Sequence, residues 1–183
     1  MVKKFAWFKG ASPVEQAADG LYRAIIAQAR QPRFYQSLEV PDTVDGRFDM
    51  VALHTFLVLR RLKREGRDAA ELAQALYDLM FADMDQNLRE MGIGDMGIGK
   101  RIKAMAQMFS GRIAAYDAGL DGDAGGGLEE ALRRNLYRKT EAGEGAVAAF
   151  ATYMRRQDQH LTGQAFAELG DGSVDFAAPP EEP

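Results

Sequence analysis

The chain has 183 residues, with 23 Lys and Arg against 27 Asp and Glu, so its formal net charge is −4. This length suits a single domain with a buried core. The absence of cysteine excludes disulfides and thiolate zinc sites, and two histidines are too few for a histidine-rich metal site. No uncharged stretch is long enough for a transmembrane helix, and the first ten residues lack the apolar core of a secretory signal.

Residues 1–11 form a basic and aromatic arm ahead of the first predicted helix. Lys3 and Lys4 are followed closely by Trp7 and Phe8. Lysines interleaved with aromatic side chains are typical of a segment that rests at a membrane interface. Two other interpretations stay open at this point: the arm folds back on the helices, or it has no fixed structure.

The rest of the chain has the pattern of an α-helical protein. Ser12, Pro13 and Glu15 make a capping box with proline at the first helical position, which predicts a helix start. Apolar residues then recur at helical spacing, and no useful length alternates as a strand would. We therefore predict an all-α fold, a single-domain irregular bundle of about six helices within residues 12–169. The predicted segments are residues 13–30, 34–40, 48–62, 69–91, 98–116, 128–139, 146–161 and 165–169.

Residues 48–62 are apolar on most of the helix circumference, which predicts a helix buried inside the bundle. His54 lies among these apolar residues, and we interpret it as a core histidine with satisfied hydrogen bonds, not as a catalytic one. The preceding link contains Asp42, Asp45, Gly46 and Arg47. We predict a purely structural turn there, with Asp45 capping the helix and Arg47 in a local ion pair.

A basic cluster follows the buried helix and includes Arg60, Arg61 and Arg64. Two interpretations are open. Bases in a last helical turn interact favourably with the helix dipole. Alternatively, these arginines form a patch that meets an anionic surface, either phospholipid or ribosomal RNA.

The segment 84–108 joins two helical runs by glycines and comes close to a phosphate-binding loop. Residues 94–100 read G-x-x-x-x-G-K, but Arg101 stands where Ser or Thr would hold magnesium, and a helix precedes the motif instead of a strand. Asp83, Asp85 and Asn87 have calcium-loop spacing without the required glycine and closing glutamate. We interpret both patterns as coincidental, and we expect no metal, no cofactor and no catalytic residues.

Methionine is enriched in the same part of the chain. Six of the nine methionines fall between positions 80 and 108. Flexible, polarizable methionines suit a groove that accepts varied apolar helices, although ordinary core packing explains them too. After residue 165 the chain has five acidic residues and no base. We predict a disordered acidic tail over residues 170–183 because its apolar content is low.

Several short blocks, taken together, resemble the ubiquinol–cytochrome c chaperone family, whose members are assembly factors for the respiratory cytochrome bc complex. The resemblance spans roughly residues 21–140, and its most specific part runs from Arg89-Glu90-Met91-Gly92 to Gly99-Lys100-Arg101. The other blocks are Pro41-Asp42, Asp45-Gly46-Arg47-Phe48, Leu53-His54, Leu59-Arg60-Arg61-Leu62, Phe81-Ala82-Asp83-Met84-Asp85, Gly94-Asp95, Phe109, Gly111-Arg112, Ala115-Tyr116 and Asn135-Leu136-Tyr137.

The resemblance implies a non-enzymatic helical chaperone that binds newly made cytochrome b near the membrane. It also implies a small partner chaperone or the ribosome as further partners, and no DNA. Because no targeting segment is recognisable, we expect a bacterial form in the cytoplasm with peripheral contact at the inner membrane. The alternative is a peripheral lipid-binding or adaptor protein without a specific client. We expect the client surface to include Arg89, Met91, Gly92, Gly94, Asp95, Met96, Lys100 and Lys103.

Overall fold

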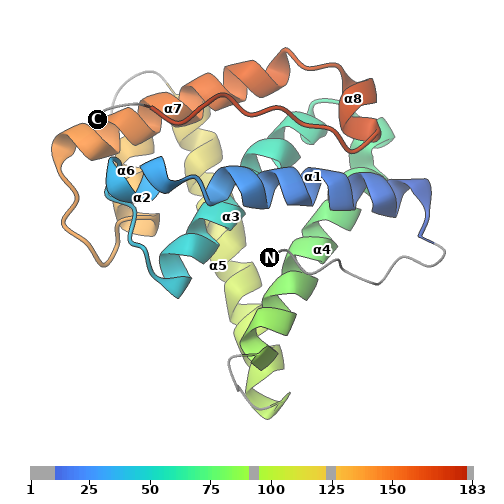
Figure 1. Ribbon diagram of the computed structural model, residues 1–183, viewed down its shortest axis with the longest axis horizontal. Helices are drawn as coiled ribbons and strands as arrows, with labels where there is room; N and C mark the ends of the chain where they lie inside the picture. Colours follow the sequence, from blue (N-terminus) through green and yellow to red (C-terminus); the bar gives the residue numbers. More distant parts are fainter. Residues whose placement is uncertain (1–10, 91–94, 123–126, 181–183) are drawn as a thin grey trace.

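The computed structural model describes residues 11–90, 95–122 and 127–180, and within these ranges it is α-helical without strands (Figure 1). Six helices have nine or more residues, and two have five, which agrees with the predicted fold. The elements in chain order are α1 (Pro13–Ala29), α2 (Pro32–Gln36), α3 (Val44–Lys63), the 3-10 turn η1 (Gly66–Ala69), α4 (Ala70–Glu90), α5 (Asp95–Asp121), α6 (Gly127–Asn135), α7 (Glu144–Thr162) and α8 (Phe166–Gly170).

The predicted capping box at the start of α1 is present. The Glu15 backbone N–H donates to Ser12 Oγ at 3.3 Å, and the Ser12 backbone N–H donates to the Glu15 carboxylate at 2.7 Å. These two bonds satisfy donors that a helix start otherwise leaves unpaired. Pro13 occupies the first helical position, as the sequence indicated.

Helix α3 is the central helix and contributes to both hydrophobic clusters of the core. Leu53 and Leu57 pack with α7 and with Phe34 of α2, whereas Val58 and Leu62 pack with α1 and α4. This explains why the sequence of α3 is apolar nearly all round: helices cover it on more than one side. The prediction of a buried helix is confirmed.

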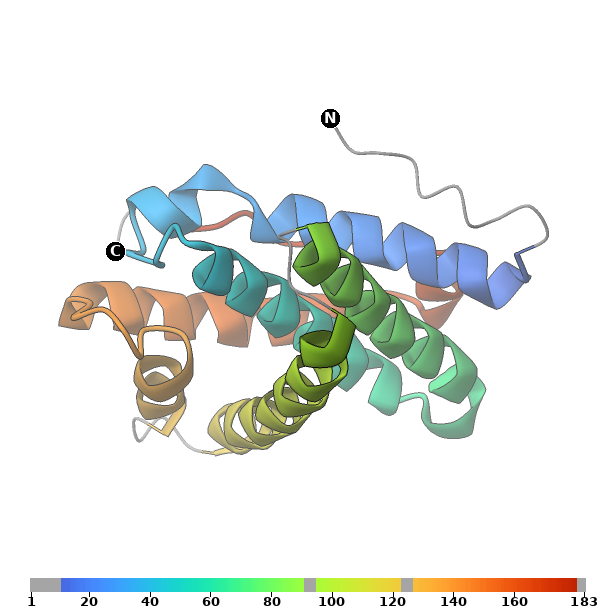
Figure 2. The same ribbon diagram turned by 90° about the horizontal axis from the view of Figure 1, so that it is seen from below.

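Helices α4 and α5 form a hairpin that projects from the bundle, at the bottom of Figure 1 and toward the viewer in Figure 2. Near the bundle the two helices share an aromatic cluster of Tyr77, Phe81 and Phe109, with ring centroids 4.7 to 6.0 Å apart. The groove described below lies where α4 and α5 meet α3.

The prediction of a disordered tail from residue 170 is wrong for residues 170–180. After α8 the chain runs back in extended form between α1 and α7 (Figure 1). Val174 and Phe176 are partly buried against the core, and backbone groups of Ala177 and Asp175 bond to the side chains of Gln157 in α7 and of Gln164 just after it. The low apolar content of the tail misled the prediction, because two apolar side chains and several backbone hydrogen bonds suffice to order a short segment on an existing surface.

His54 is fully buried beneath this segment, and its predicted core role is confirmed. Its Nδ1 lies 2.8 Å from the Met50 carbonyl oxygen and its Nε2 lies 2.8 Å from the Tyr153 hydroxyl. Phe176 from the C-terminal segment contacts the imidazole edge, with ring centroids 5.6 Å apart. Burial lowers the pKa of His54 to about 4, because the charged imidazolium would lose its hydration.

This burial predicts a pH dependence of stability. In the unfolded chain the pKa of this histidine is near 6.5, above its value in the folded protein. The contribution of neutral, buried His54 to the free energy of unfolding is therefore complete above pH 6.5 and is lost as pH falls toward 4. Relative to a His54→Gln variant, the wild-type free energy of unfolding should fall by about 3 kcal/mol between these pH values. Urea unfolding monitored by circular dichroism at several pH values measures it, and parallel profiles for the two proteins would contradict this expectation.

Candidate functional site

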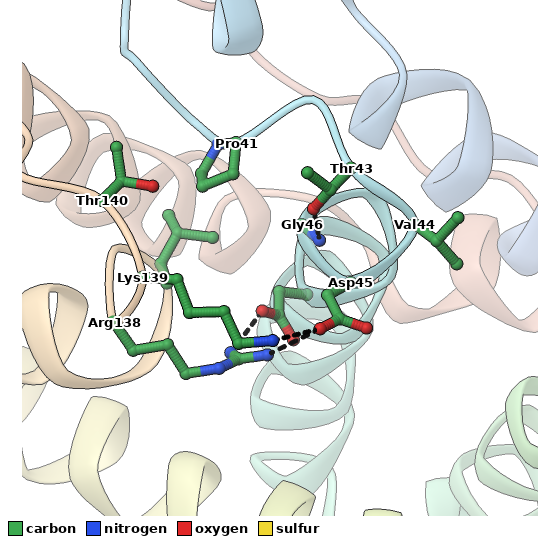
Figure 3. A pocket seen from close by; sticks show the side chains of 10 residues that line it. Pro41, Thr43, Val44, Asp45, Gly46, Arg138, Lys139 and Thr140 are labelled. Carbon is green, nitrogen blue, oxygen red and sulfur yellow. Dashed lines mark hydrogen bonds and ion pairs between the residues drawn. The ribbon is translucent and has the colours of Figure 1, made fainter.

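Two hollows lie side by side on the molecule and share a wall of charged side chains. The first lies between the start of α3 and the loop after α6, with a volume of about 280 Å³ (Figure 3). Pro41, Thr43 and Val44 line it on one side and Thr140 on the other. The Thr43 hydroxyl caps α3 by accepting from the Gly46 backbone N–H at 3.1 Å. Gly46 packs on Pro41 so closely that a Cβ there would collide with the Pro41 carbonyl oxygen.

The second hollow lies between α3, α4 and α5, has a volume of about 390 Å³, and is called the groove here. Its lining combines an apolar floor with a polar edge. Met108 is 51% exposed, whereas Phe109 is 3% exposed and closes the bottom. The apolar lining residues are Phe48, Leu88, Ala104, Met105, Met108 and Phe109.

The wall between the hollows is an ion-pair network made by Asp45, Asp49, Arg138 and Lys139, and Arg112 joins it from α5. Lys139 Nζ lies 2.7 Å from the Asp45 carboxylate and Arg138 Nη1 lies 2.5 Å from the Asp49 carboxylate. Figure 3 shows Arg138 and Lys139 reaching across to Asp45. The network therefore ties α3 to α5 and to the loop after α6.

Asp49 is the buried centre of this wall, with 5% of its side chain exposed. Burial raises the pKa of the Asp49 carboxyl above its usual value, although the guanidiniums of Arg112 and Arg138 both favour its ionised form. Asp45, in contrast, is 58% exposed, and a hydrogen bond from Lys139 lowers its pKa. Both arginines thus share one buried carboxylate, and Arg138 also donates to the Asn135 carbonyl oxygen at 2.6 Å.

The methionines divide between the two interpretations that the sequence left open. Met80 and Met84 are buried in the core at 0% and 4% exposure. Met105 and Met108 line the groove, and Met105 also packs partly on the core. Core packing therefore explains the methionines of α4, and the groove interpretation fits Met105 and Met108 of α5.

The residues expected at a client surface are only partly described. Arg89 is exposed and bonds Asp85 with Nε at 2.6 Å, and Lys103 is exposed on α5. Neither lines the groove, although Leu88 beside Arg89 does. Asp95, Met96 and Lys100 belong to α5, but their side chains lie outside the described part. Met91, Gly92 and Gly94 lie outside the described residues altogether.

The prediction of an anionic-surface patch is wrong for Arg60 and Arg61. Arg60 is only 10% exposed and pairs with Asp117, Asp121 and Asp158. Arg61 is buried and donates to the carbonyl oxygens of Leu161 and Gln164, at 3.0 and 2.9 Å.

Arg64, 38% exposed, pairs with Asp158 at 3.0 Å. The acidic partners of Arg60 and Arg64 thus come from α5 and α7 and are distant in the chain, whereas Arg61 pairs with nearby Glu65 at 2.6 Å. The other residues of the expected membrane surface, Lys3, Lys4, Trp7 and Phe8, lie outside the described residues.

In the predicted structural turn, Arg47 pairs locally with Asp42 at 2.6 Å, and this hydrogen bond lowers the pKa of Asp42. The helix cap, however, is Thr43 and not Asp45, whose carboxylate belongs to the wall. Sequence reasoning missed Asp49, Arg138 and Lys139. The one available signal was Asp49 itself, a lone carboxylate in the predicted buried helix, where it needs a charged partner.

A protein-family model described as ubiquinol-cytochrome C chaperone matches residues 36–176. The chain belongs to this family. It is 28% identical over 148 residues to ubiquinol-cytochrome-c reductase complex assembly factor 1 of Xenopus laevis, covering 81% of this chain and 74% of that protein. The assembly factors of Mus musculus and Homo sapiens are each 27% identical, and the chain spans about half of their length, 50% and 49%.

A solved structure has the same architecture. The crystal structure of the Cbp3 homolog from Brucella abortus is similar with a TM-score of 0.83 and 37% sequence identity, covering 93% of this chain and 94% of that one. The hollows and their wall lie within the residues that the family model matches. Across the described ranges, none of the helices has the length and apolarity to span a membrane, and no cluster of potential metal ligands occurs.

Proposed function

We propose that this chain is an assembly chaperone for the ubiquinol–cytochrome c reductase complex, that it acts without catalysis, and that its client is newly made cytochrome b near the membrane. Membership of the chaperone family and the names of the relatives support the assembly role. The observation that carries the client proposal is the groove. It places exposed Met108 and partly covered Met105 over an apolar floor, next to fixed cations.

The chemistry of the groove suits an apolar helix with polar ends. Unbranched methionines adapt to different side chains, so a groove lined by them accepts a client without requiring one exact shape. Arg112, Arg138 and Lys139 stand at the polar edge and can meet carbonyl groups or acidic residues at the end of such a helix. Because Asp45 and Asp49 hold these cations in place, little side-chain entropy is lost when the client binds.

Deletion of the gene tests the assembly role. Cells without it should contain at least tenfold less assembled ubiquinol–cytochrome c reductase, measured by the absorbance of reduced b-type haem in membranes and by native electrophoresis. Complementation with a tagged copy should restore the complex, and capture of the tag from membranes should recover cytochrome b. Normal amounts of the complex in the deleted strain would refute the assembly role. Restoration without recovery of cytochrome b would refute the client. A small partner protein or ribosome in the captured material would extend the proposal.

A further inference from the structure

The C-terminal segment 173–178, called the strap here, lies in a channel between α1 and α7 and has the geometry of a bound peptide (Figure 1). Exposed and partly buried residues alternate over its first four positions: Ser173 and Asp175 are exposed, and Val174 and Phe176 pack on the core. This period of two is that of an extended strand that presents one face to its support.

Glutamine side chains hold the strap through its backbone. Gln164, in the link between α7 and α8, both donates to the Asp175 carbonyl oxygen, at 2.7 Å, and accepts from the Asp175 N–H, at 2.9 Å. Gln157 of α7 makes the same pair of bonds with Ala177, at 2.6 and 3.1 Å. Gln28 of α1 donates to the same Ala177 carbonyl oxygen at 3.0 Å. Bonds of this kind recognise any extended chain, because every residue except proline offers the same N–H and C=O groups.

Selectivity in this channel comes from the apolar sites. Phe176 contacts the edge of His54, and Val174 packs against both core clusters. Asp175 points outward and pairs with His160 at 2.9 Å. The channel thus favours a segment with an apolar residue, an outward polar residue and an aromatic residue at consecutive positions.

The strap is anchored at one end. Gly172 has a φ of +81° and packs on the backbone of Ala17, while its carbonyl oxygen approaches Gly20 so closely that a Cβ on Gly20 would touch it. Residues 173–178 beyond this anchor make no helix and no strand pairing. The Ser173 N–H donates to the Glu168 carbonyl oxygen, and the backbone groups of Asp175, Ala177 and Ala178 bond to side chains. Release of the strap therefore needs no helix to unfold.

We propose that the channel between α1 and α7 is a binding site for extended polypeptide segments with alternating apolar side chains, and that the strap occupies it as a displaceable internal ligand. The incoming segment is an unfolded stretch of the client, and only this identification rests on the proposed function. Binding in the channel would add an extended-chain site to the groove, so that one chaperone holds two kinds of client segment.

A fluorescein-labelled peptide of residues 172–180 tests the site without any client. A tethered ligand competes at an effective concentration of about the millimolar range, so the wild-type chain should bind the peptide weakly. The full chain with Phe176→Ser should bind it at least tenfold more tightly by fluorescence anisotropy, because its own strap competes poorly. Phe166→Ser, which removes another partly buried phenylalanine, in α8, is the matched control and should bind like wild type.

In the Phe176→Ser background, the additional change Gln157→Ala should remove peptide binding. A folded Phe176→Ser chain that fails to bind the peptide, or that binds it regardless of Gln157, overturns the proposal and leaves the proposed function untouched. Hydrogen exchange on the wild-type chain decides the matter if Phe176→Ser does not fold. The amides of Asp175 and Ala177 should exchange at least a hundredfold faster than the central amides of α7, through release of the strap alone. Exchange of both sets at one common rate overturns the proposal.

Discussion

Replacement of Asp49 by Asn should destabilise the protein by about 3–5 kcal/mol, the usual cost of leaving the partner of a buried ion pair without its counter-charge. Asp49 is 5% exposed and accepts from Arg112, which is 11% exposed, and from Arg138. Arg112 would be left largely covered without its counter-charge, whereas Arg138 is 30% exposed. Urea unfolding at pH 7 measures the loss of free energy.

Asp45→Asn is the matched control for this prediction, because Asp45 belongs to the same wall but is 58% exposed. Its loss should cost at most about 1 kcal/mol, as for other exposed pairs. Combining Asp49→Asn with Arg112→Gln should cost less than the sum of the two single changes, since one unpaired charge is then removed. Equal and small effects of the Asp45 and Asp49 changes would show that the buried carboxylate does not hold the wall together.

Replacement of Met108 by Glu should abolish assembly of the complex while leaving the chaperone folded. Met108 is 51% exposed, so a glutamate there remains hydrated in the free protein and the unfolding midpoint should stay close to that of wild type. Against an apolar client helix the same carboxylate would lose its water, which costs several kcal/mol, because the cations of the groove are already paired with Asp45 and Asp49. Because each 1.4 kcal/mol is tenfold in affinity, client binding should fall at least tenfold.

The measurement is the amount of assembled complex in a deletion strain that expresses the variant. Gln107→Glu is the matched control, because it adds the same charge at the preceding position of α5, exposed and outside the groove. It should support normal assembly. Normal assembly by the Met108→Glu chain, at equal protein level, would mean that the client does not bind in the groove.

The sequence by itself determined the helices and their approximate limits. Ser12, Pro13 and Glu15 act within four residues, so the start of α1 could be read directly. The apolar circumference of α3 predicted a central helix, and the surroundings of His54 predicted a satisfied core histidine. The family resemblance was also carried by residues close together in the chain, and the family model matches residues 36–176. All of these signals depend on neighbours within one or two helical turns.

Only the tertiary structure decided which charges and segments come together. Arg60 and Arg61 resembled a free basic patch until α5 and α7 supplied partners about 60 to 100 positions away. The groove arises because Phe48 of α3 meets Met105 of α5, and Asp49 gains Arg138 from 89 positions further on. The strap has too few apolar residues to fold alone, yet it is ordered on a surface that α1 and α7 provide. Pairing between residues so far apart in the chain leaves no periodic signal in the sequence. Each partner fits the helical pattern of its own segment whether or not the other is present.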